Sequence, residues 1–142
     1  MIEMRLIVSI VFAMLVVAST ADKFQDWKDQ METLQGKCTN QYKLNDAAIT
    51  ELLNANTVDV TDKNIQKLLY CIALDQGFMD SEGTLGTEKI AEHLKKLDLD
   101  EKTIKAVNKK CSSIEKPSDK NVLVGLYYKC YENELPRKYL VL

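Results

Sequence analysis

Apolar side chains recur at intervals of three and four residues along almost the whole chain after residue 21. This is the period of an α-helix that buries one face. The first such stretch runs through Phe24, Trp27, Met31, Leu34 and Cys38. Two prolines and five glycines among 142 residues leave little room for the turns that many short strands need. The sequence therefore predicts an all-α fold.

Capping and turn residues divide this pattern into six short helices of roughly 10–17 residues each. Asn45 is a good N-cap for a second helix over residues 46–53. Thr61 is expected to cap a third helix over residues 62–75, and Gly77 stands where a C-terminal stop belongs.

The same signals continue in the second half of the chain. Thr87 is expected to cap a fourth helix. Asp98, with Glu101 three residues later, resembles the capping box of a fifth. The sixth is expected over residues 119–135 and ends at Pro136. An apolar tail, Tyr139–Leu142, follows, and we expect it either to fold back as a lid or to be disordered.

The N-terminal segment has the pattern of a secretory signal peptide. Leu6–Val17 is almost wholly apolar, and the small residues of Ala18–Ala21 follow it. The apolar run is shorter than the ~20 residues of a membrane span, although an uncleaved anchor is the alternative. We expect residues 1–21 to be removed, which leaves one extracellular domain over residues 22–142 with no stable membrane insertion.

The charge balance argues against a nucleic-acid partner. The chain has 19 Lys and Arg residues against 21 Asp and Glu residues, which gives a formal net charge of −2. Binding to nucleic acid usually needs a strongly basic surface.

Each of the four cysteines continues the apolar face of a different predicted helix. In a secreted chain, an even number of such cysteines indicates disulfides, and four cysteines allow three pairings. Free buried thiols are the alternative. The two closest, Cys111 and Cys130, are 19 positions apart. Zinc sites use closely spaced ligand pairs, so we predict no metal site.

No catalytic site is predicted. His93 is the single histidine, and the helical period places it beside an apolar face, as a surface or half-buried side chain. The chain has no Gly-x-Ser-x-Gly motif, no calcium loop and no glycine-rich phosphate cradle. We therefore predict neither an enzyme nor a bound cofactor.

The cysteine spacing resembles that of a known family. The cysteines are separated by 32, 39 and 18 residues, and the stretch from Leu69 to Leu85 is similar to the third helix and following turn of the insect odorant-binding proteins. The six-cysteine members of that family have further cysteines where this chain has Lys67 and Asn121. The chain thus resembles the four-cysteine, "minus-C" form.

The resemblance implies two disulfides, Cys38–Cys71 and Cys111–Cys130, and a central hydrophobic cavity enclosed by the six helices. By matched position, it implies cavity-wall, ligand-binding side chains at Met31, Leu69, Ala73, Ile90, Leu94, Ile104, Val107, Val124, Tyr127, Tyr131 and Leu140, with Phe78 as a further candidate. The alternative for each of these residues is a position in a solid core.

The function that the resemblance implies is extracellular transport of a small hydrophobic molecule, such as an odorant or pheromone, in sensillar lymph, haemolymph or gland fluid. Contact with a receptor and weak homodimerisation fit the same interpretation. Two alternatives remain: a general lipid carrier of haemolymph or gland, and a secreted cytokine-like factor with an occluded core that binds a protein.

Overall fold

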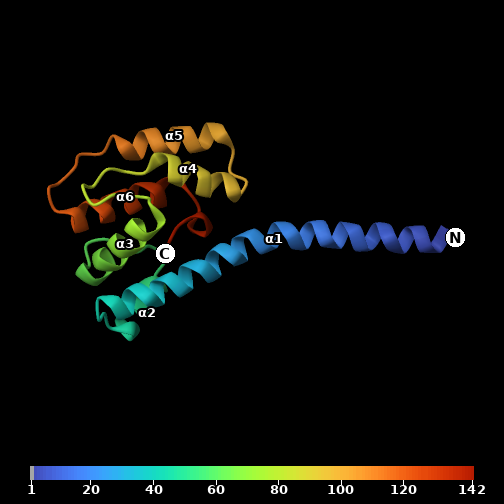
Figure 1. The fold of residues 1–142 in the computed structure, drawn as a ribbon, viewed down its shortest axis with the longest axis horizontal. Coiled ribbons are helices and arrows are strands. Elements are labelled where there is room, and N and C mark those ends of the chain that lie inside the picture. The colour runs from blue at the N-terminus through green and yellow to red at the C-terminus, as the bar shows by residue number, and fades with distance from the viewer. Residues whose placement is uncertain (1) are drawn as a thin grey trace.

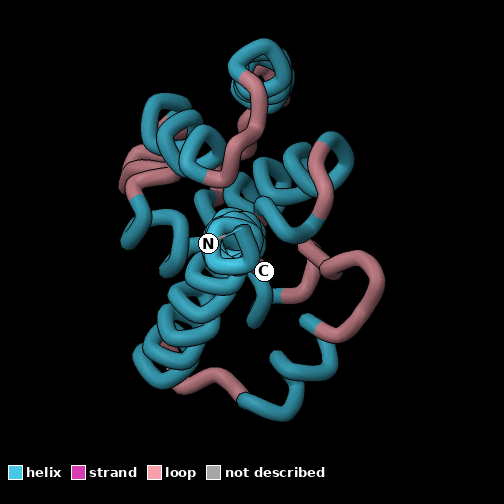
Figure 2. The backbone as a smooth tube through the Cα atoms, turned by 90° about the vertical axis from the view of Figure 1, so that its right-hand side faces the viewer, coloured by secondary structure: helices cyan, strands magenta, loops and turns pink. Residues whose placement is uncertain are grey.

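The structure is a computed structural model that describes residues 2–142, with side chains from Asp22 onward. The described residues form six α-helices and one 3₁₀ helix, and contain no β-strand (Figure 2). The elements are α1 (Ile2–Gln41), α2 (Asp46–Leu53), α3 (Lys63–Gln76), α4 (Thr87–Lys96), α5 (Glu101–Ser112), α6 (Lys120–Glu134) and η1 (Arg137–Tyr139). The predicted all-α fold is confirmed.

Helix α1 is by far the longest element, with 40 residues. Its first half extends away from the other helices, and its second half packs beside α3 (Figure 1). The predicted cleavage point lies within this helix, but the side chains of residues 1–21 lie outside the described part. The signal peptide therefore stays a prediction. Among the described residues, no helix has both the length and the apolar character that a membrane crossing requires.

Several predicted helix boundaries are confirmed by local hydrogen bonds. The side chain of Asn45 accepts a hydrogen bond from the N–H of Ala48 at 3.1 Å, and α2 covers residues 46–53 as predicted. Gly77 ends α3 in the left-handed conformation, with φ of 72°. Asp119 caps α6 by accepting from the N–H groups of Asn121 and Val122.

Three predicted N-caps are wrong by one or two positions. Asp62 rather than Thr61 caps α3, because the Thr61 hydroxyl donates to Asp59 instead. Asp100 rather than Asp98 caps α5, since its carboxylate accepts from the N–H of Thr103.

Asp98 has a positive φ of 64°, which lets the chain turn between α4 and α5. Helix α4 begins at Thr87 itself, and the residue before it, Gly86, offers no side-chain cap. In each case the competing signal lay within two residues, where a pattern alone does not choose between neighbouring capping groups.

The buried side chains form two clusters that share helix α6. The larger cluster joins α1, α2 and α3 to the first part of α6, around Ile65, Leu68, Leu69 and Ile72. The smaller one joins α4 and α5 to the end of α6, around Ile90, Leu94, Ile104 and Val107.

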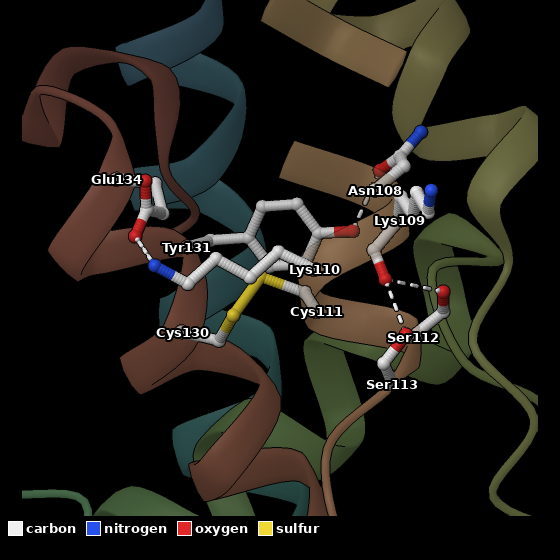
Figure 3. The surroundings of a disulfide bond; sticks show 9 residues. All are labelled: Asn108, Lys109, Lys110, Cys111, Ser112, Ser113, Cys130, Tyr131 and Glu134. Carbon is white, nitrogen blue, oxygen red and sulfur yellow. Dashed lines mark hydrogen bonds and ion pairs between the residues drawn. A yellow bond between two sulfur atoms is a disulfide. The ribbon is translucent and has the colours of Figure 1, made fainter. Parts of the chain in front are cut away.

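Each cluster contains one disulfide. Cys38–Cys71 links α1 to α3 in the larger cluster, and Cys111–Cys130 links α5 to α6 in the smaller. Both pairings are those that the resemblance implied. Figure 3 shows the second disulfide beside two further links between the same helices: the Lys110–Glu134 ion pair and the hydrogen bond from Tyr131 to Asn108.

Candidate functional site

A cavity of about 80 Å³ lies where the two clusters meet. The wall is built by α3, α4, α6, the loop before α4, and the C-terminal tail. Its side chains are almost all apolar or aromatic: Leu69, Ala73, Phe78, Met79, Leu85, Ile90, His93, Leu94, Val124, Tyr127, Tyr128, Tyr131, Leu135, Tyr139, Leu140 and Val141. Such lining is typical of small-molecule sites.

Most of the side chains predicted from the sequence lie in this wall. Nine are placed there: Leu69, Ala73, Phe78, Ile90, Leu94, Val124, Tyr127, Tyr131 and Leu140. Met31, Ile104 and Val107 are buried but do not line the cavity. Met31 lies under an outer groove beside α1, and Ile104 and Val107 pack between α4, α5 and α6.

The prediction missed seven wall residues: Met79, Leu85, His93, Tyr128, Leu135, Tyr139 and Val141. Tyr128 and Leu135 continue the faces of α6 on which Tyr131 lies, so the helical period could have found them. Met79 and Leu85 are brought together by a single antiparallel bridge across the 80–84 turn. No periodic pattern covers a turn of that kind.

The tyrosine hydroxyls of the wall are engaged by the protein itself. The Tyr127 hydroxyl donates to the carbonyl oxygen of Gly83 at 3.1 Å, and the Tyr131 hydroxyl donates to Oδ1 of Asn108 at 2.6 Å. Burial raises the pKa of Tyr131, and that of Tyr128 as well, so both stay neutral. These hydroxyls give the cavity polar atoms without adding charge.

The C-terminal tail packs over the cavity, and side chains of the helices hold it through hydrogen bonds to its main chain. Side chains from three helices donate to its carbonyl oxygens: His93 to residue 139, Trp27 to residue 140, Gln35 to residue 141 and Tyr128 to residue 142. The donor–acceptor distances are between 2.6 and 3.3 Å. The tail is thus attached to α1, α4 and α6 at once.

Arg137 anchors the start of the tail. Its guanidinium donates to the carbonyl oxygens of Leu53 and Ala55, at the end of α2, and to that of Leu142. Leu53 is the last residue of α2, where carbonyl groups have no partner within the helix, so this contact satisfies its carbonyl oxygen. It also connects the tail to α2.

His93 lies in an aromatic cluster at the edge of the cavity. Its ring centroid is 3.8 Å from that of Trp27 and 5.5 Å from that of Phe78. Burial lowers the pKa of His93, the hydrogen bond to the tail partly opposes this, and nearby Lys96 adds to the lowering. Because a carbonyl oxygen only accepts, the neutral ring bonds Tyr139 through a protonated Nε2.

The arrangement is suited to holding an apolar molecule. Within the described residues, every buried side-chain nitrogen or oxygen has a hydrogen-bond partner. The cavity therefore presents apolar and aromatic surface, with its polar atoms already paired.

Comparison with known proteins agrees with this arrangement. The sequence model of the PBP/GOBP family matches residues 20–134, which is 115 of the 142 residues. No curated protein matches the sequence. The family consists of secreted carriers of small hydrophobic molecules rather than enzymes. With this match over most of its length, six helices and a four-cysteine pattern that fits the minus-C form, the chain belongs to the PBP/GOBP family of insect odorant-binding proteins.

Proposed function

We propose that this chain is an extracellular carrier that binds an odorant, a pheromone or a similar semiochemical in the cavity between the two clusters. Residues 1–21 would direct its secretion and be removed near Ala21. The family match, which begins at residue 20, supports this boundary. The observation that carries the proposal is an apolar cavity covered by a hydrogen-bonded tail.

The size of the cavity implies that it expands around a ligand. Small-molecule pockets commonly measure about 300–1,000 Å³, whereas this cavity measures about 80 Å³. A ligand of ordinary size would therefore have to widen the cavity. The energy of binding would come from the transfer of apolar ligand surface out of water, about 25 cal/mol per Å².

Filling the cavity tests the proposal. Ala73 on α3 lines the cavity and is 7% exposed, so Ala73→Leu places a larger side chain in the space that a ligand needs. Ala47→Leu makes the same change on the exposed surface of α2 and serves as the matched control. Binding is measured by displacement of a fluorescent apolar probe from each protein.

We expect Ala73→Leu to weaken probe binding about tenfold or more, which corresponds to at least ~1.4 kcal/mol, and Ala47→Leu to leave it unchanged. Equal binding by both variants and the wild type would show that ligands bind elsewhere, for example in the outer groove beside α1. No binding by the wild type would favour the alternative of a protein-binding factor with an occluded core.

The cargo itself is best identified from the natural source. Native mass spectrometry of the purified protein would detect a small molecule that stays bound. A volatile compound supports the transport of a semiochemical, and a fatty acid or other lipid supports a general carrier of haemolymph or gland fluid.

A further inference from the structure

Two of the groups that hold the tail are neighbouring hydrogen-bond donors. Nε2 of His93 lies 2.6 Å from the carbonyl oxygen of Tyr139, and Nε1 of Trp27 lies 3.0 Å from that of Leu140. The centroids of the His93 and Trp27 rings are 3.8 Å apart. Two adjacent N–H groups therefore face two successive carbonyl oxygens of the tail. His93 lines the cavity, and Trp27, which lines the outer grooves instead, lies directly against the His93 ring.

The tail is the part of the wall that can give way to a ligand most easily. The other wall residues lie on helices α3, α4 and α6, or in the loop that leads into α4. Helices α3 and α6 are each fixed by a disulfide to another helix. Tyr139, Leu140 and Val141 follow or end the short η1 and are held by single side-chain hydrogen bonds. Expansion of the cavity therefore moves these residues outward.

An outward shift of the tail leaves the N–H groups of His93 and Trp27 without their acceptors. A donor that is buried against an apolar ligand and has no partner weakens binding considerably. A ligand that carries its own acceptor replaces the lost carbonyl oxygens and removes this penalty.

Two of the other polar groups of the wall do not create the same demand. The hydroxyls of Tyr127 and Tyr131 are bonded to Gly83 and Asn108, which are not part of the tail. They keep their partners when the tail moves. The Tyr128 hydroxyl does donate to the tail, but at Leu142, which does not line the cavity.

We propose that His93 and Trp27 form a donor pair that selects ligands with a hydrogen-bond acceptor, such as the carbonyl group of a ketone, aldehyde or ester, at one end of an apolar body. This inference rests on the proposed function, because it assigns a ligand class to the same cavity.

A matched ligand pair tests the selection. One ligand is a long-chain methyl ketone, and the other is the alkene in which a methylene group replaces the carbonyl oxygen. The affinity ratio of ketone to alkene is measured by probe displacement for the wild type and for three variants. His93→Phe and Trp27→Phe keep an aromatic ring and remove one N–H group each. Tyr42→Phe removes the hydroxyl of a ring that is 38% exposed and does not line the cavity, and it is the control.

We expect His93→Phe and Trp27→Phe to lower the ketone-to-alkene ratio about fivefold or more relative to the wild type, and Tyr42→Phe to leave it within about twofold. A second measurement needs no variant. The carbonyl carbon-13 signal of the labelled ketone, bound to the wild type, should move downfield from its position in a hydrocarbon solvent, because the carbonyl accepts a hydrogen bond.

Two results would overturn the inference. An unchanged ratio in His93→Phe and Trp27→Phe, or a carbonyl signal as in hydrocarbon solvent, removes the donor pair while the carrier function stands, since both ligands bind. If neither ligand displaces the probe from the wild type, both the donor pair and the proposed function are wrong.

Discussion

His93 is a titratable ring that lies against both Trp27 and Phe78 and is bonded to the tail. Because burial lowers its pKa from the usual 6.5, the folded protein favours the neutral ring. Its contribution to stability is complete above about pH 6.5 and is lost as the pH falls through the lowered pKa of the folded state.

This predicts an acid-sensitive stability that depends on one residue. The melting temperature of the wild type should fall more between about pH 7.5 and about pH 4.5 than that of His93→Gln. Carboxylates titrate in both proteins, so the comparison isolates the imidazole. Equal decreases in the melting temperatures of the two proteins would show that the folded protein does not favour the neutral form of His93.

Gly86 is the glycine at which an added Cβ atom would meet the closest neighbour. A Cβ atom there would lie 2.1 Å from the carbonyl oxygen of Gly77, which is backbone and cannot rotate away. Gly36, on α1, has nothing within 4 Å of the same position. Replacement by alanine is therefore expected to have opposite effects on stability at the two positions.

Gly86→Ala should lower the free energy of unfolding by about 2 kcal/mol or more, and Gly36→Ala should raise it by about 0.5–1 kcal/mol because alanine favours the helix. Urea unfolding of both variants measures the difference. A neutral Gly86→Ala would mean that the loop before α4 shifts without cost.

At the scale of the elements, the C-terminal tail from η1 onward covers the cavity rather than extending into solvent. It contributes three wall residues, Tyr139, Leu140 and Val141, and it is attached to α1, α2, α4 and α6 by hydrogen bonds. Both figures of the whole chain place the C-terminal end beside α1 (Figures 1 and 2). Since the attachments are many and individually weak, the tail can move without unfolding a helix.

Deletion of Tyr139–Leu142 should therefore increase the dissociation rate of an apolar probe and weaken its binding about tenfold. Stopped-flow dilution of the preloaded protein measures the rate. Arg137 remains in this variant and keeps its contacts with α2, so we expect the shortened protein to fold. Unchanged release would show that the helices alone retain the ligand.

At the scale of the whole molecule, the two disulfides cross-link each cluster internally, but neither joins α3 to α6. These two helices pack against each other and form much of the cavity wall. The six-cysteine relatives have their third disulfide at the positions of Lys67 on α3 and Asn121 on α6. The relative position of the two helices thus depends on packing alone.

A third cross-link should make the carrier more rigid. The double variant Lys67→Cys/Asn121→Cys, oxidised and shown by thiol titration to lack free cysteines, should be more stable by about 2–4 kcal/mol and should exchange its ligand more slowly. The same protein under mild reduction is the control. Unchanged exchange in the oxidised form would mean that α3 and α6 do not separate when a ligand enters.

Much of the fold could be predicted because its signals are local. The N-cap at Asn45, the left-handed stop at Gly77 and the helical period of α3 each depend on groups within about one helical turn. The errors at Thr61 and Asp98 were also local, since a neighbouring aspartate formed the cap instead. The disulfide pairing came from the family resemblance, because spacing alone leaves three choices.

The sequence by itself determined the helices, their buried faces and the family to which the chain belongs. The tertiary structure decided which buried side chains surround a cavity: Ala73 and Tyr131 do so, whereas Met31 and Val107 are packed elsewhere. It also decided that the one histidine meets the tail. The physical reason is that an amphipathic face specifies burial but not the partner, and a cavity is the space that distant segments leave between them when they pack.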